Sequence, residues 1–113
     1  MKMYTNSNQT AKMIELGFEK PKSIVECELP KGDWRIGAVG IRKAYSIGEL
    51  LSFLPENIAI ENEMPSTLNI SLLDCEWCVE YADFLGADFS FRNVELIDAA
   101  FNMVVKLKDE GVI

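Results

Sequence analysis

The sequence predicts an α+β domain in which a small antiparallel sheet packs on a C-terminal helix. Two observations support this fold class. Residues 67–82 alternate apolar and polar side chains as a β-hairpin does, and residues 94–110 repeat apolar side chains at helical spacing. The chain has 113 residues, 49% of them hydrophobic, which is enough for one core. We therefore expect residues 1–113 to form a single domain.

A first short helix is expected near residues 7–16. Asn6 or Ser7 can cap it, because a side-chain oxygen at that position accepts an otherwise unpaired backbone N–H. Gly17 suits the left-handed position that ends many helices, and Pro21 prevents the helix from continuing. The apolar stripe expected on this helix consists of Ala11, Ile14, Leu16 and Phe18.

Two strands are expected next, at residues 24–29 and 34–41, with a turn at 30–33 between them. The first alternates apolar and acidic side chains, as a strand does. Two glycines weaken the assignment of the second. Whether this pair extends the sheet of the later hairpin is left open.

A second short helix is expected near residues 47–54. Ser46 and Glu49 form a capping-box pattern, in which each side chain accepts the other's backbone N–H, and Pro55 ends the helix. Residues 55–65 are interpreted as an acidic connector. The side chains expected to face the core are Leu50, Leu51 and Leu54.

The hairpin at residues 67–82 has one favoured register. If Asp74 and Cys75 form the turn, the apolar side chains of both strands fall on one face, beneath the C-terminal helix. Asp-Cys is not a favoured pair for such a tight turn, so a longer turn in the same register is also possible. The pairs expected on the apolar face are Leu68 with Tyr81, Ile70 with Val79, and Leu72 with Trp77.

The Cys-x-x-Cys formed by Cys75 and Cys78 is interpreted as structural. In an extended chain the two α-carbons lie roughly 10 Å apart, whereas a disulfide requires less than about 7 Å. Redox motifs usually lie at a helix N-terminus, whereas this pair is predicted in a hairpin among acidic neighbours. The chain has no histidine, and Cys27 is its only other cysteine, which leaves a zinc site short of ligands. We expect no catalytic residue, no cofactor and no metal.

The last part of the chain predicts a loop and then a helix. Residues 84–91 are expected to form a loop whose phenylalanines fold back on the core. The helix at 94–110 follows, with Asn93 as its N-cap and Gly111 just beyond its C-terminus. Its apolar stripe consists of Ile97, Ala100, Phe101, Val104 and Leu107.

The net charge of −7 is unevenly distributed. Residues 1–43 carry a net charge of +3, whereas residues 44–91 contain nine acidic and no basic side chains. The acidic middle argues against direct nucleic-acid binding, because phosphates would be repelled. It also supplies a candidate interaction surface for a protein. That surface comprises Glu49, Glu56, Glu61, Glu63, Glu76, Glu80, Asp83 and Asp88.

The sequence also indicates a cytoplasmic protein. Its longest apolar runs are far short of the ~20 residues of a membrane helix, and the N-terminus lacks the apolar middle of a signal peptide. An odd number of cysteines agrees with a reducing compartment. We expect no contact with a membrane.

The order of motifs resembles that of small proteins of bacterial phages, prophages and mobile elements. The resemblance is carried by "IELGF", "YSIGELLSFLP", "EWCVEY" and "LIDAAFNMVVKLKDEGVI", and residues 23–41 lie outside it. Those proteins have no assigned activity, so the resemblance implies an origin and no mechanism. It is strongest at Trp77, Tyr81, Leu96, Ile97, Asp98 and Ala99.

These observations favour a non-enzymatic protein that acts by binding another protein, or a second copy of itself as a homodimer. Two alternatives stay open. One is an acidic DNA mimic that inhibits a nucleic-acid enzyme, which requires the acids of residues 44–91 to form one face. The other is an enzyme that uses carboxylates alone, which requires a pocket with converging acidic groups.

Overall fold

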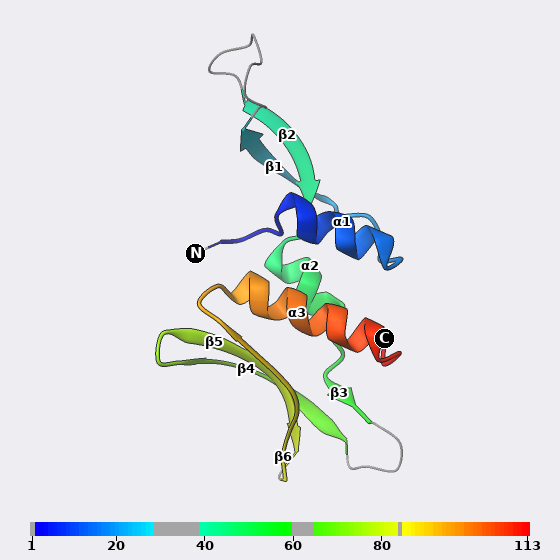
Figure 1. The fold of residues 1–113 in the computed structure, drawn as a ribbon, viewed down its shortest axis with the longest axis vertical. Coiled ribbons are helices and arrows are strands. Elements are labelled where there is room, and N and C mark those ends of the chain that lie inside the picture. Colours follow the sequence, from blue (N-terminus) through cyan, green and yellow to red (C-terminus); the bar gives the residue numbers. More distant parts are fainter. Residues whose placement is uncertain (1, 29–38, 60–64, 84) are drawn as a thin grey trace.

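The computed structural model describes residues 2–28, 39–59, 65–83 and 85–113, and it confirms the α+β class (Figure 1). The molecule is elongated, with extents of 59 × 33 × 18 Å. Its elements are α1 (Ser7–Glu15), β1 (Ser23–Glu28), β2 (Val39–Ala44), α2 (Ile47–Ser52), β3 (Asn57–Ile58), β4 (Ser66–Leu73), β5 (Glu76–Asp83), β6 (Gly86–Asn93) and α3 (Leu96–Asp109).

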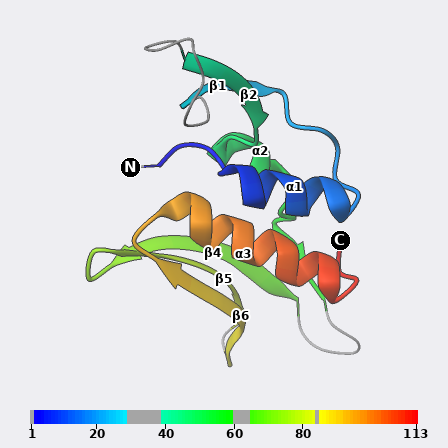
Figure 2. The same ribbon diagram turned by 45° about the horizontal axis from the view of Figure 1, so that its top comes forward.

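The layers are arranged around α3. A four-stranded antiparallel sheet of order β3-β4-β5-β6 lies on one side of this helix, and α1 and α2 lie on the other (Figures 1 and 2). The hairpin of β1 and β2 projects from the end farthest from the sheet. Because α3 is covered from two sides, its buried residues are more numerous than one amphipathic stripe requires. They are Leu96, Ile97, Ala99, Ala100, Met103, Val104 and Leu107.

Other elements complete the core around α3. Val79 and Tyr81 enter it from β5, Met13 from α1, and Leu50 from α2, and all four are fully buried. The Tyr81 hydroxyl donates a hydrogen bond of 2.7 Å to the carbonyl of Pro55. Burial raises the pKa of Tyr81 to about 12, so this phenol remains a hydrogen-bond donor throughout the neutral range.

The predicted register of the β4–β5 hairpin is confirmed. Leu68 pairs with Tyr81, Ile70 with Val79, and Leu72 with Trp77. The turn has only two residues, Asp74 and Cys75, with φ of 50° and 65°. Positive φ at both central residues is the type I′ geometry, which matches the twist of the flanking strands.

One feature of the hairpin differs from the prediction. Ile70 and Leu72 were expected beneath the C-terminal helix, but they are 37% and 56% exposed. The reason is that α3 packs mainly over β5 and β6, so that only the first part of β4, with buried Ser66 and half-buried Leu68, reaches the core.

The strands near residues 24–29 and 34–41 do not extend this sheet. β1 and β2 form a separate two-stranded antiparallel ladder, from the Ser23–Ala44 pair to the Glu28–Val39 pair. Residues 29–38, including the predicted turn and most of the predicted second strand, lie outside the described residues.

Two segments predicted to be irregular contain strands. Residues 84–91 were expected to be a loop, but Gly86–Asn93 is β6, in which Phe89 and Phe91 pair with Tyr81 and Val79 of β5. Their period-two spacing is the strand signal that the loop prediction overlooked. The connector at 55–65 contains the short strand β3, whose Ile58 is buried; residues 60–64 lie outside the described part.

Two of the three predicted helix N-caps are confirmed. Asn6 with Gln9, and Ser46 with Glu49, each form a complete capping box. α2 ends at Ser52, two residues before the predicted end. The predicted N-cap of α3 is wrong: this helix begins at Leu96 and its N-cap residue is Glu95, while Asn93 accepts a hydrogen bond of 2.9 Å from the backbone N–H of Glu95.

The predicted apolar stripe of α1 is wrong at two positions. Ala11 is exposed and Ile14 is 43% exposed, whereas Thr10 and Met13 are the buried residues of this helix. On the inward side of α1, Met13 joins the core and the Thr10 hydroxyl lies 2.7 Å from that of buried Thr5. The apolar contact and the polar contact together favour this side of α1 as the inward one.

Candidate protein-interaction site

One edge of the four-stranded sheet is covered for only part of its length. β3 pairs with the start of β4 through Asn57 with Thr67 and Ile58 with Ser66. The backbone N–H of Leu68 also donates to the carbonyl of Glu56 at 2.8 Å. Beyond Leu68, no strand in the described part of the chain pairs with this side of β4. We call residues 69–73 the open edge.

The hydrogen bond at Leu68 fixes which backbone groups point outward. In an antiparallel ladder, successive residues direct their N–H and C=O groups to alternate sides. Since Leu68 points toward β3, Ile70 and Leu72 point to the same side, away from β5. Asn69 and Ser71 point toward β5. The open edge therefore presents the N–H and C=O groups of Ile70 and Leu72.

The side chains of the open edge are apolar and accessible. Leu72 is 56% exposed, Leu73 is 47% exposed and Ile70 is 37% exposed. Ile70 and Leu72 lie on the face that carries α3, and Leu73 lies on the opposite face. Exposed apolar groups beside unpaired backbone groups are a surface to which another strand can bind.

Soluble proteins normally protect sheet edges with charges, prolines or bulges. β4, with the sequence STLNISLL, contains no charged residue and no proline. β6, the opposite edge strand of this sheet, contains Asp88 and Arg92 and has a bulge opposite Tyr81 and Ala82. Of these two edges, only that of β4 lacks the usual protection.

The outer face of β5 carries two of the predicted acidic residues. Glu76 and Glu80 alternate there with Cys78, whose thiol is 3.8 Å from a Glu80 carboxylate oxygen and 3.6 Å from the Ser90 hydroxyl.

The two cysteines of the Cys-x-x-Cys pattern lie in different surroundings. Cys78 is buried, while Cys75 is exposed in the turn, and both are free thiols. This confirms that the two cysteines are not bridged.

Glu49 lies elsewhere, on α2, which is separated from the sheet by α3 (Figure 1). Its carboxylate accepts hydrogen bonds from the Ser23 hydroxyl at 2.6 Å and from the backbone N–H of Lys22 at 3.1 Å, in addition to its capping bond with Ser46. Burial opposes ionisation of Glu49, but these hydrogen bonds outweigh it and lower its pKa. Glu49 therefore joins α2 to the start of β1.

The other predicted acidic residues are distributed over several places. Glu56, before β3, is exposed. Asp83 accepts a hydrogen bond of 2.7 Å from the backbone of Leu85, and Asp88 accepts one from the Ser66 hydroxyl. The structure thus brings Glu76 and Glu80 onto one strand face. Glu61 and Glu63 lie outside the described residues.

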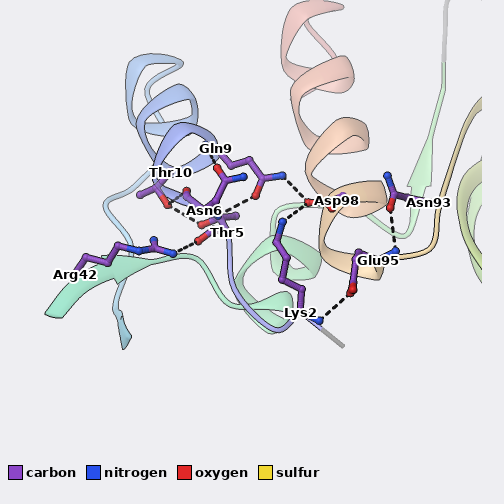
Figure 3. Close-up of polar contacts among 9 residues, drawn as sticks. All are labelled: Lys2, Thr5, Asn6, Gln9, Thr10, Arg42, Asn93, Glu95 and Asp98. Carbon is purple, nitrogen blue, oxygen red and sulfur yellow. Dashed lines mark hydrogen bonds and ion pairs between the residues drawn. The ribbon is translucent and has the colours of Figure 1, made fainter. Parts of the chain in front are cut away.

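A polar cluster fastens the N-terminal segment to α3 (Figure 3). Asp98 accepts hydrogen bonds from the Lys2 ammonium at 2.9 Å and from the Gln9 side chain at 2.7 Å. Burial opposes ionisation of Asp98, but these hydrogen bonds and the charge of Lys2 hold its pKa below its usual value. The backbone N–H of Lys2 donates to Glu95 at 2.8 Å. All of these contacts join elements of the fold.

The same cluster continues to Thr5, which is fully buried. Its hydroxyl oxygen accepts a hydrogen bond of 3.0 Å from the backbone N–H of Tyr45 and contacts the Thr10 hydroxyl at 2.7 Å. Arg42 of β2 donates to the Thr5 carbonyl at 2.8 Å (Figure 3). Thr5 therefore connects the N-terminal segment, α1 and β2.

A pocket of about 470 Å³ lies between the C-terminal end of α3 and β3. Glu110 is the one ionisable side chain among its described lining residues. A catalytic site needs several converging titratable groups, and this pocket does not supply them. The lining residues are Pro55, Asn57, Ile58, Ala59, Glu110, Gly111 and Val112.

In the described ranges, no three cysteine, aspartate or glutamate side chains converge as metal ligands do. None of the described helices has both the length and the apolar composition needed to cross a membrane.

Comparison of the chain with protein-family models, with curated proteins and with solved structures finds no match. The resemblance to phage proteins stays a prediction.

The sequence reasoning missed the open edge, although one signal of it was readable. The segment STLNISLL, with no charge and no proline, stands out in a chain of which 26% is charged. What the sequence did not reveal is the extent of β3, which covers β4 only as far as Leu68.

Proposed function

We propose that the protein acts by binding another protein along the open edge of β4, and that it has no enzymatic activity of its own. The observation that carries this proposal is the uncharged strand β4, whose outward backbone groups at Ile70 and Leu72 have no partner strand among the described residues. Addition of a strand to a sheet edge is a recurrent mode of protein recognition.

The chemistry of the edge defines the ligand. Backbone hydrogen bonds at Ile70 and Leu72 contribute affinity, at about 0.5–1.5 kcal/mol net each, and they require an extended segment. The exposed side chains of the same two residues favour apolar side chains opposite them. The bound segment is therefore a β-strand with apolar residues on one face. Given the resemblance to phage proteins, we expect the partner to be a phage or host protein.

This proposal predicts the result of affinity capture from a lysate of the source organism. A protein captured by the wild type should be lost when Leu72→Lys places a charge on the open edge. A matched control is Leu85→Lys, since Leu85 is 80% exposed in the turn between β5 and β6. The two variants have the same net charge, and quantitative mass spectrometry compares what they retain.

The proposal fails if Leu72→Lys and the wild type retain the same proteins in the same amounts. It also fails if Leu85→Lys causes an equal loss, because the effect would then follow net charge and not the edge. Circular dichroism of each variant verifies that the fold is intact.

A further inference from the structure

We infer that the segment bound at the open edge is basic: an extended strand of a partner protein in which apolar side chains alternate with lysine or arginine. This inference rests on the proposed function, because it takes the same edge as the binding surface. It goes further by stating the charge and the sequence pattern of the partner.

Acidic side chains surround the open edge. Glu56 lies at one end, where its carbonyl accepts the N–H of Leu68, and Asp74 lies at the other end, in the turn; both acids are exposed. Glu76 and Glu80 lie on the outer face of β5, across β4 from the edge. The described residues 55–59 and 65–83, which hold β3, β4 and β5, contain no lysine and no arginine. Clustered charge of one sign attracts a partner of the opposite sign.

Little within the described sheet offsets the charge of Glu76 and Glu80. Arg92 of β6 lies on the same outer face, in the ladder between β5 and β6, but it is two strands away from the open edge. The ion pairs formed among the described residues use Asp98 and Glu110, on α3 and just after it. The two glutamates are therefore available to a cation that approaches from the edge.

The side chains of β4 leave room for such a cation to reach them. A strand bound at the open edge lies about 10 Å from β5, which is two strand spacings. Ser71 separates the two on the outer face, and its partner on β5, Cys78, lies between Glu76 and Glu80. A lysine or arginine opposite Ser71 can extend over this short side chain toward both glutamates, because its charge is carried on a long flexible stem.

The two faces of the edge set the alternation in the partner. Directly opposite residues of neighbouring strands share a face. Partner side chains opposite Ile70 and Leu72 therefore join exposed apolar groups on the α3 side. Those opposite positions 69, 71 and 73 lie on the acidic side, where the stem of a lysine also covers exposed Leu73. Five partner residues thus read basic, apolar, basic, apolar, basic.

The ends of the edge limit where this strand can lie. The Glu56 carbonyl occupies the place beside Leu68, so the bound strand must end or turn away there. At the other end it can extend past the exposed turn of Asp74 and Cys75. A second copy of β4 does not fit the pattern, since it has no basic residue and brings its own acids with it.

Titration with synthetic peptides, followed by amide chemical shifts in NMR spectra, tests the inference because it locates weak binding at single residues. The probe is KVKVKVK with both ends blocked, and the neutral reference is TVTVTVT. At an ionic strength of about 0.1 M, exposed charges interact over about 10 Å. We expect shifts at residues 69–73 and a dissociation constant about tenfold lower for the basic peptide, as a few exposed ion pairs supply. The block peptide KKKKVVV, which lacks the alternation, should bind more weakly than KVKVKVK.

The preference for the basic peptide should depend on the glutamates of β5. The double variant Glu76→Gln with Glu80→Gln should reduce it to about threefold or less and leave binding of TVTVTVT unchanged. The matched control is Glu15→Gln with Glu19→Gln, which removes the same charge at exposed positions on the α1 side of α3, away from the sheet (Figure 1). This control should keep the preference.

Salt gives a second measurement that needs no variant. Raising the ionic strength to about 1 M shortens the Debye length to about 3 Å, so the two peptides should then bind alike. Circular dichroism verifies that each variant is folded. If the variant with both glutamates replaced is misfolded, the salt series on the wild type decides the charge dependence.

The outcomes separate this inference from the proposed function. Equal affinity of KVKVKVK and TVTVTVT, with shifts at residues 69–73, overturns the basic partner and leaves strand binding at the edge intact. A preference that survives loss of Glu76 and Glu80, or equally tight binding of KKKKVVV, also overturns it. Shifts elsewhere, or binding that Leu72→Lys does not weaken relative to Leu85→Lys, place the peptide outside the edge and overturn it too. If no peptide binds, the inference fails, and affinity capture still decides the proposed function.

Discussion

Leu107→Ala should lower the free energy of unfolding by about 2–5 kcal/mol, the range for truncating a buried leucine. Leu107 is fully buried near the C-terminal end of α3 and belongs to the core cluster. Alanine removes apolar contacts and leaves a cavity that the surrounding core fills only in part. A domain of this size has a total stability on the order of 5–15 kcal/mol. Urea denaturation followed by circular dichroism measures the loss.

The matched control is Leu85→Ala, the same chemical change at a side chain that is 80% exposed. We expect it to alter the free energy of unfolding by no more than about 0.5 kcal/mol, as is usual for surface substitutions. Equal effects of the two variants would contradict the position of α3 at the centre of the core.

Thr5→Val should lower the free energy of unfolding by about 1–3 kcal/mol, the cost of leaving a buried polar group without its partner. Valine has nearly the shape of threonine, so the packing is retained. The buried backbone N–H of Tyr45 loses the oxygen to which it donates at 3.0 Å. The Thr10 hydroxyl also loses a neighbour at 2.7 Å. The measurement is again urea denaturation, with the m value as a check that the unfolding transition is of the same kind.

Thr67→Val is the control for Thr5→Val. Thr67 is exposed on β4 and donates to the Asn57 side chain at 3.0 Å, where water can replace the lost group. We expect a change of no more than about 0.5 kcal/mol. If Thr5→Val is as mild as Thr67→Val, the buried polar cluster does not fix the N-terminal segment in the way we describe.

The features that the sequence predicted well are those that depend on neighbouring residues. The cap at Asn6 needs one side-chain oxygen next to the first turn, and the capping box at Ser46 needs two side chains three positions apart. The β4–β5 register follows from alternation on both sides of a short turn, since a slip of one residue would turn every apolar side chain outward.

The features that the sequence did not predict depend on distant residues. The side of α1 that faces inward depends on the contact of Met13 with a core built from α2, β5 and α3, and the Lys2–Asp98 ion pair joins residues 96 positions apart. Neither contact produces a periodic pattern of apolar residues in the sequence.

The strand β6 was not predicted for another reason. The sequence predicts Phe89 and Phe91 in a loop that covers the core, but their pairing with β5 shows that they belong to the sheet.

The open edge that we propose as the site does not consist of the acidic residues that the sequence singled out, and the kind of site stays a prediction. The sequence indicated a binding protein and directed attention to its acidic residues. Glu76 and Glu80 share the outer face of β5, whereas Glu49 is occupied in joining α2 to β1. The open edge depends on where β3 stops along β4, and that is set by tertiary structure.

Amide hydrogen exchange at residues 69–72 of the isolated protein in micromolar solution tests the central claim most directly, because it reports each backbone N–H separately. We predict slow exchange for Asn69 and Ser71, which point toward β5, and fast exchange for Ile70 and Leu72, which point to the open edge. Protection of all four amides at this dilution would show that the edge is covered within one chain. Fast exchange of all four would show that β4 and β5 are not paired as described.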